Sequence, residues 1–175
     1  MRKPKRKINR LTEYDYAQNG AYFITICTHE RQRILWGNDT FTGAENVGAS
    51  IARPQRPPAL SKAGKVVEQC IWEIPKQYPH ISLEKYAIMP NHVHLLLLIQ
   101  NGPGGRPMVA PTISTVIQQF KGVVSKRLSR PIWQKSFHDH VVRTEHGYAQ
   151  IWQYIDTNPQ LWHKDCFYEE PPHEP

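Results

Sequence analysis

The hydrophobic positions of this chain are spaced as in β-strands in some segments and as in α-helices in others. Short runs rich in β-branched and aromatic residues predict strands, and apolar residues spaced three and four apart predict helices. The expected elements, in chain order, are a strand over 21–28, a helix from 61 to 75–79, strands over 83–89 and 92–99, a helix over 112–128, a strand over 133–142 and a helix over 145–158. This order predicts an α+β fold, with a ferredoxin-like or RRM-like antiparallel sheet, helices on one face and an added C-terminal helix.

Local residues predict where several of these elements begin and end. Ser61 and Thr112 each precede an apolar-periodic run and are expected to cap the first two helices. Pro90 and Asn91 predict a turn, so the strands on either side of them are expected to form a hairpin. Pro159 cannot continue a helix, so the last helix is expected to end just before it.

The length of the chain suits one domain. A chain of 175 residues can bury a substantial core but is short for two domains. We expect a basic N-terminal arm over 1–19, a single domain over 20–164 and an acidic tail over 165–175. Residues 37–60 are rich in Gly, Pro, Ala and Asn and predict a surface loop inserted in that domain.

The composition excludes several classes of protein. Hydrophobic residues make up 39% of the chain, and mean hydropathy is -0.58. The longest apolar run, 95–99, is far shorter than the roughly 18 residues that a membrane span needs. No apolar segment follows the basic N-terminus, so we expect no secretory signal. The three widely spaced cysteines are typical of a reducing compartment. We therefore expect a cytoplasmic protein with no membrane partner.

Positive charge is concentrated in two segments. Lys and Arg number 22 against 15 Asp and Glu, which gives a net charge of +7. The candidate DNA-binding residues are Arg2, Lys3, Lys5, Arg6, Lys7 and Arg10 in the arm, and Lys121, Lys126, Arg127 and Arg130 in a stretch from 85 to 138 that has no acidic residue. A basic arm together with a long acid-free stretch is typical of a protein that binds nucleic acid. A solvated basic surface is the alternative interpretation.

Two histidines in one predicted strand form the strongest candidate site. Side chains alternate across a strand, so His92 and His94 are expected to point to the same face, and Val93 to the other. Two imidazoles at this spacing can share one metal ion, and a phosphate site is the alternative. Two ligands are too few to close a structural zinc site, so an ion bound there would keep open positions for a substrate.

A second pair of histidines has the same spacing. His138 and His140 lie on another predicted strand and flank Asp139. We interpret this pair as mainly structural, or as support for ligands elsewhere. From its spacing alone it could also be a ligand pair.

The last predicted helix contains a candidate nucleophile. At 100° per residue, Tyr148, Ile151, Trp152 and Ile155 form one apolar stripe, so Tyr148 is interpreted as a core residue. Tyr154 and Asn158 lie four residues apart on the flank of that stripe. Tyr154 is therefore expected to reach a site, with an amide one turn away. A half-buried structural tyrosine beside the end of the helix is the alternative.

Several nucleotide-dependent functions have no motif here. The glycine-rich segment at 102–105 is not followed by the Gly-Lys-Ser or Gly-Lys-Thr of a P-loop. We find no dinucleotide-binding fingerprint, no nucleophile elbow and no zinc ribbon. A reaction catalysed by this chain is not expected to need ATP.

Residues 86–97, YAIMPNHVHLLL, resemble the HUH signature of the single-tyrosine transposases. The chain is more similar still to the REP-associated tyrosine transposases, bacterial relatives that are linked to repetitive extragenic palindromes. Further similar stretches are 14–16, 20–28, 120–121, 133–134, 137–143 and 154–159, the last of which reads YIDTNP. The resemblance extends from residue 11 to residue 164, and 37–60 is the segment that it covers least.

The resemblance implies a reaction and a set of site residues. His92 and His94 match the metal ligands, Tyr154 matches the catalytic tyrosine, and Asn158 matches the third ligand. Members of the family cleave single-stranded DNA at foldback hairpins with Mg²⁺ or Mn²⁺, through a 5′-phosphotyrosine intermediate. The resemblance thus implies a cytoplasmic, nucleoid-associated bacterial DNA endonuclease and strand transferase. A monomer is expected from the nearer relatives, although insertion-sequence relatives act as dimers.

Two other functions remain open on these residues. One is a non-catalytic regulator of the same fold that binds DNA or RNA hairpins. The other is a metal-dependent hydrolase in which Tyr154 has only a structural role. The first predicts hairpin binding without a covalent adduct, and the second predicts a free 5′-phosphate end.

Overall fold

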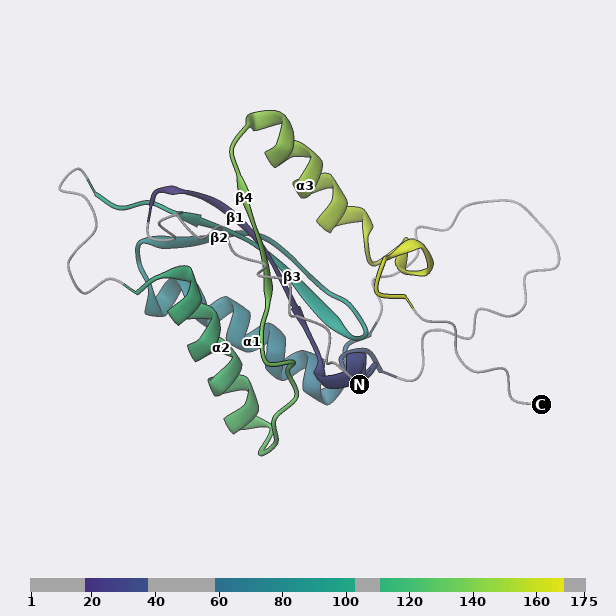
Figure 1. The fold of residues 1–175 in the computed structure, drawn as a ribbon. Helices are drawn as coiled ribbons and strands as arrows, with labels where there is room; N and C mark the ends of the chain where they lie inside the picture. The colour runs from purple at the N-terminus through teal and green to yellow at the C-terminus, as the bar shows by residue number, and fades with distance from the viewer. Residues whose placement is uncertain (1–17, 38–58, 103–110, 169–175) are drawn as a thin grey trace, which may run out of the picture.

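The computed structural model describes residues 18–37, 59–102 and 111–168 (Figure 1). The basic residues of the expected arm, almost all of the expected loop 37–60 and the end of the acidic tail lie outside the described residues. The elements are β1 (Gly20–Cys27), α1 (Lys62–Gln77), β2 (Ile81–Ile88), β3 (His92–Ile99), α2 (Ile113–Arg127), β4 (His138–Val142) and α3 (Glu145–Thr157), with short 3-10 helices at His29–Arg31 and Trp162–Lys164.

The four strands form one antiparallel sheet in the order β2-β3-β1-β4. Helices α1 and α2 lie on one face of this sheet and α3 lies on the other (Figure 1). This confirms the α+β, ferredoxin-like prediction, including the added C-terminal helix. The hairpin of β2 and β3 is also as expected, with β3 over the predicted residues.

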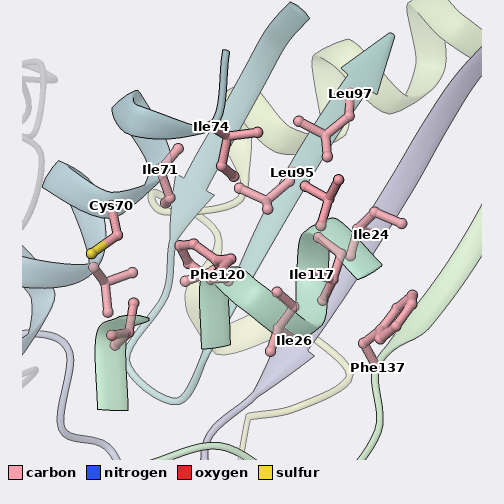
Figure 2. Packing of buried hydrophobic residues seen from close by; sticks show 14 of the residues in the cluster. Ile24, Ile26, Cys70, Ile71, Ile74, Leu95, Leu97, Ile117, Phe120 and Phe137 are labelled. Carbon is pink, nitrogen blue, oxygen red and sulfur yellow. The ribbon is translucent and has the colours of Figure 1, made fainter. Parts of the chain in front are cut away.

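The main core fills the space between the sheet and the pair α1 and α2. Ile24 of β1 and Leu95 of β3 point into it, where they meet Ile71 of α1 and Phe120 of α2 (Figure 2). Because side chains alternate along a strand, this packing turns His92 and His94 to the opposite face of β3. The core therefore decides which face carries the candidate site.

Side-chain caps begin the three described α-helices. The hydroxyls of Ser61, Thr112 and Thr144 each accept a hydrogen bond from a backbone N–H in the first turn of the helix that follows. The two caps predicted from the sequence, Ser61 and Thr112, are thus confirmed. At the other end of α3, Asn158 is the C-cap and Pro159 follows it.

The expected strand over 133–142 is wrong in its first half, because β4 begins only at His138. Trp133 makes a single bridge to Thr28, beyond the end of β1. The carbonyls of Gln134 and Ser136 accept hydrogen bonds from the Lys121 ammonium, at 2.5 and 3.2 Å, and are not part of the sheet ladder. The hydrogen bonds from Lys121 and the packing of Trp133 in the core thus outweigh the strand propensity of this segment.

The expected apolar stripe of α3 is also wrong in part. Of its members only Ile155 is buried. Trp152 is 38% exposed and has the Lys85 ammonium 4.8 Å from its ring centroid. Tyr148 is half-buried, and its hydroxyl donates to Glu84. The stripe is split because α3 packs over β2 and β3 near the edge of the sheet, which leaves one flank of the helix in solvent.

Among the described residues, no helix combines the length and the apolar character that crossing a bilayer requires.

Candidate metal and tyrosine site

His92 and His94 form the centre of the candidate site. Their side chains are 0% and 1% exposed, and their Nε2 atoms lie 2.9 Å apart. Both rings point away from the main core toward the layer that contains α3. The sequence prediction that they share one face is therefore confirmed.

The other nitrogen of each ring is held by a neighbouring side chain. His92 Nδ1 lies 2.8 Å from Asn91 Oδ1, and His94 Nδ1 lies 2.9 Å from the Thr25 hydroxyl of β1. The Asn91 oxygen can only accept, so His92 carries its proton on Nδ1 and its Nε2 keeps a lone pair. These contacts aim both Nε2 atoms at one point, as supporting hydrogen bonds do for metal-ligating histidines.

Burial keeps both imidazoles neutral. It lowers the pKa of His92 to about 3, with a smaller contribution from the Arg31 guanidinium. Burial, and then the neighbouring His92, hold the pKa of His94 well below its usual value. Neutral imidazole is the form that binds a metal ion. The pair is therefore in its ligating form at neutral pH.

Asp165 brings a carboxylate into this site from the C-terminal segment. The residue is 8% exposed, and its Oδ2 lies 3.8 Å from His92 Nε2. The same oxygen accepts hydrogen bonds from Asn158 Nδ2 at 2.9 Å and from the Tyr154 hydroxyl at 3.1 Å. Asp165 thus connects the predicted nucleophile, the predicted amide ligand and the histidine pair.

Sequence reasoning missed this residue and placed it at the start of the acidic tail. It stands outside the predicted elements, so no periodicity assigns it to a face. The available signal was its setting, because an isolated acid followed by Cys166, Phe167 and Tyr168 differs from the acidic, proline-rich sequence after it.

Aromatic and cationic side chains hold the Asp165 segment in place. The Arg31 guanidinium lies 5.1 Å from the Phe167 ring centroid, and that of Arg33 lies 5.2 Å from the Tyr168 ring centroid. The Phe167 ring lies 4.8 Å from that of His92, and its carbonyl accepts from Asn91 Nδ2 at 2.9 Å. The segment is thereby packed against the histidines.

Tyr154 of α3 stands at the mouth of the site. It is 39% exposed, and its hydroxyl lies 3.4 Å from His94 Nε2. Phe23 of β1 stacks on His94 at 5.1 Å and meets the Tyr154 ring edge-on at 6.0 Å. Burial, and then the Asp165 charge, raise the pKa of Tyr154, so the phenol is protonated at neutral pH. The tyrosine is both exposed to solvent and adjacent to the possible ligands.

Asn158 lies one turn after Tyr154 and is 3% exposed. Its amide nitrogen donates to Asp165, so the carboxylate holds the orientation of this side chain. The structure thus brings together all four residues that the resemblance assigned to the site.

The predicted DNA-binding residues of α2 lie elsewhere. Lys121, Lys126 and Arg127 belong to a helix on the sheet face opposite His92 and His94, and Arg130 follows that helix. Arg127 pairs with both carboxylate oxygens of Glu73, at 2.8 and 2.9 Å. The arm residues from Arg2 to Arg10 lie outside the described residues.

The second histidine pair lies on the same face as the first. Thr25 of β1 is the register partner of His94 on one side and of His138 on the other. His138 and His140 are both exposed. Because β1 lies between β4 and β3, they are too far from the ligand pair to share an ion, but they lie on the same face of the sheet.

Comparison with known proteins assigns the chain to a family. No family model matches the sequence. A protein of Haemophilus influenzae, itself uncharacterized, is 30% identical over 182 aligned positions that cover 93% of each chain. The chain belongs to the same family as this Haemophilus protein. Membership in that family leaves the activity to be argued from the site.

A solved structure is similar to this chain in fold. A REP-associated tyrosine transposase bound to a REP hairpin matches with a TM-score of 0.59 and 17% identity, covering 87% of this chain and 74% of that chain. At this identity the likeness concerns the fold. The resemblance to the REP-associated tyrosine transposases that the motifs indicate is thus confirmed as a transposase-like fold.

The donor atoms in this fold suit a divalent metal ion. His92, His94 and Asp165 offer ligand atoms that all lie within 4.8 Å of one another, and all three residues are buried. Two imidazole nitrogens and one carboxylate are a common set for first-row divalent metals, and they leave coordination positions open. The three residues could therefore hold an ion beside Tyr154.

Proposed function

We propose that this protein is a metal-dependent endonuclease and strand transferase that cleaves single-stranded DNA at hairpins and forms a 5′-phosphotyrosine. The observation that carries the proposal is the position of the Tyr154 hydroxyl, 3.4 Å from His94 Nε2 and on the exposed side of the ligand cluster. A nucleophile beside open metal positions is the arrangement that phosphoryl transfer needs.

The ligand cluster would supply the electrostatic part of the reaction. His92, His94 and Asp165 would hold Mg²⁺ or Mn²⁺, and Asn158 would add its amide oxygen once its contact with Asp165 rearranges. When bound there, a divalent ion would neutralise charge on the scissile phosphate and help to orient it. Imidazole ligands favour Mn²⁺ over Mg²⁺.

Tyr154 supplies the nucleophile. Its oxygen attacks the phosphorus, a new O–P bond forms, and the bond to the 3′ oxygen breaks. The phenolic proton has an acceptor at 3.1 Å in Asp165 Oδ2, and the leaving 3′ oxygen takes up a proton to become a hydroxyl. One phosphodiester replaces another, so attack by a 3′ hydroxyl can reverse the step and join strands.

Hairpin DNA is the substrate class that the fold favours. The solved transposase with this fold is bound to a REP hairpin. The net charge of +7 supports binding to a polyanion, and we expect that binding to weaken as salt increases.

The experiment uses foldback DNA labelled at either end, incubated with the protein and Mn²⁺ and run on a denaturing gel. We expect the 3′ label to migrate with the protein and the 5′ label to be released on a free strand. Tyr154→Phe should lose the covalent band and keep hairpin binding. Tyr148→Phe is the matched control, because Tyr148 lies on the same helix and bonds to Glu84 outside the site.

Two results would replace the proposal. A free 5′-phosphate end with no covalent band would identify a hydrolase in which Tyr154 is structural. Hairpin binding without cleavage, with either ion and with every hairpin tried, would identify a non-catalytic regulator.

A further inference from the structure

A cavity of about 460 Å³ lies between α2 and the segment that leads into β4. The candidate metal site faces the other side of the sheet, so this cavity is separate from it. The residues that carry the argument below are Lys121, Gly122, Trp133, Lys135 and Phe137, all of which line the cavity. Its volume is within the range of about 300–1,000 Å³ that is usual for small-molecule sites.

The walls of the cavity are held in place by the fold. Trp133 is buried, bridges to Thr28 and lies 6.0 Å from the Phe120 ring. The Lys121 ammonium donates to the carbonyls of Gln134 and Ser136, which pins the loop to α2. These contacts fix two walls of the cavity.

The lining combines cations with aromatic rings. Lys121 and Lys135 are the charged residues, and no carboxylate occurs among the described residues that line the cavity. The Lys121 ammonium has three donors, of which two are used by the loop carbonyls. The buried indole N–H of Trp133 has no hydrogen-bond partner among the described residues. Two ammonium groups thus lie beside two aromatic side chains, Trp133 and Phe137, that pack in the main core and are 7% and 9% exposed.

We propose that this cavity binds one unpaired nucleotide of the single-stranded DNA that the protein processes, with its phosphate at Lys121 and Lys135 and its base at the aromatic wall. Single-strand binding sites combine these two elements, a basic path for the backbone and rings for the bases. The assignment of DNA as the source of the nucleotide rests on the proposed function.

The course of β4 links the cavity to the metal site. Phe137 lines the cavity, and the next residue, His138, turns to the opposite face of the sheet at its open edge. His138 and His140 are exposed there, and Thr25 separates His138 from His94. Two interstrand spacings amount to about 10 Å. A DNA strand that leaves the cavity around this edge would meet both histidines before it reaches Tyr154.

The first test closes the cavity from the helix side. A Cβ atom at Gly122 meets nothing within 4 Å, so a side chain fits there without strain. Replacing a helical glycine also favours folding. Gly122→Glu places a carboxylate in the cavity, and Lys135→Glu reverses the charge at its rim. Lys65→Glu is the charge-matched control for Lys135→Glu and exceeds the charge change of Gly122→Glu, because Lys65 is exposed on α1 outside the cavity.

The measurement is fluorescence anisotropy with a labelled oligothymidylate at low salt. We expect Gly122→Glu and Lys135→Glu each to weaken binding at least tenfold beyond Lys65→Glu, with thermal melting showing that each variant is folded. Equal affinity of all three variants would overturn the proposal.

A second measurement separates this proposal from the proposed function. Thymidine 5′-monophosphate should shift the Trp133 indole N–H resonance of the whole protein, and Gly122→Glu should abolish that shift. This measurement does not depend on cleavage, so a protein that forms no covalent adduct can still show nucleotide binding in the cavity. Inorganic phosphate that produces the same shifts at the same concentration would show an anion site only and would overturn the nucleotide proposal.

Discussion

The carboxylate of Asp165 accepts a hydrogen bond from the hydroxyl of Tyr154 at 3.1 Å, although the two residues come from different structural elements. Tyr154 belongs to α3, and Asp165 follows the short helix Trp162–Lys164. The contact links the ionisation of the candidate nucleophile to a group that can also bind a metal ion.

Replacing Asp165 with Asn should lower the pKa of Tyr154. Burial is the larger cause of the raised pKa and remains in the variant, but the negative charge beside the phenol is removed. The pKa should therefore fall part of the way toward its ordinary value. NMR titration of tyrosine labelled at Cζ measures this shift, with Tyr154→Phe to assign the resonance. A pKa that rises in the variant would contradict the geometry.

The same substitution should weaken Mn²⁺ binding. Asp165 provides the only carboxylate of the cluster His92, His94 and Asp165. Asp165→Asn and His94→Ala should each raise the Kd for Mn²⁺ by at least about tenfold, since losing even a supporting residue costs roughly 10–100-fold. Electron paramagnetic resonance of free Mn²⁺ measures the Kd. His146→Ala, at an exposed position on α3, is the control.

Removing the hydroxyl that supports His94 should also weaken Mn²⁺ binding. Thr25 is 4% exposed, and its oxygen lies 2.9 Å from His94 Nδ1. Thr25→Val keeps the shape of the side chain and deletes that contact. We expect a loss of roughly 10-fold in Mn²⁺ affinity, measured in the same way. Unchanged affinity would mean that Phe23 packing alone orients the ring.

The free energy of unfolding of the metal-free protein should fall as the pH drops below the ordinary range of histidine. The pKa of folded His92 is about 3, and that of unfolded histidine is about 6.5. Between these values the unfolded chain binds the extra proton, so stability increases with pH across this window and is lost as pH falls through it. Each such histidine contributes on the order of 1.4 kcal/mol per pH unit in the window.

Urea denaturation at pH 7.5, 6.0 and 5.0 tests this pH dependence. His92→Gln should flatten the slope, because glutamine does not titrate. A wild-type protein equally stable at all three pH values would show that the buried histidines do not titrate as the structure indicates.

Replacing Arg31 should make the segment that contains Asp165 and Phe167 open more often. The guanidinium lies 5.1 Å from the Phe167 ring centroid, and an exposed cation–π contact contributes about 0.5–1 kcal/mol. Arg31→Ala should therefore speed exchange of the Phe167 amide hydrogen, which donates to Asp165 Oδ1. Hydrogen exchange followed by NMR provides the measurement. Lys164→Ala, whose exposed side chain lies near the same segment, is the control.

The fold and most of the site follow from local patterns in the sequence. Alternation in β3 places His92 and His94 on one face, and helical spacing in α3 brings Tyr154 and Asn158 together. Asp165 could not be predicted in this way, because cation–π contacts and hydrogen bonds from distant residues hold its segment. The predicted start of β4 was wrong for a related reason. Lys121 donates hydrogen bonds to the carbonyls of Gln134 and Ser136, which a strand would have used in the sheet.

The position of α2 relative to the site also depends on tertiary structure. Its basic residues were identifiable from charge alone, but sequence gives no indication of which sheet face the helix covers. The main core decides this, because Phe120 and Ile117 of α2 pack with the β3 side chains that point away from the histidines (Figure 2).

The central claim is that Tyr154 becomes covalently attached to DNA. The most direct measurement is tandem mass spectrometry of the protein after incubation with hairpin DNA and Mn²⁺, followed by nuclease and protease digestion. We predict a nucleotide joined through a phosphodiester to the tyrosine at position 154, in the wild type and in Tyr148→Phe. A nucleotide found on another residue, or no modified peptide from a preparation that cleaves the DNA, would contradict the account.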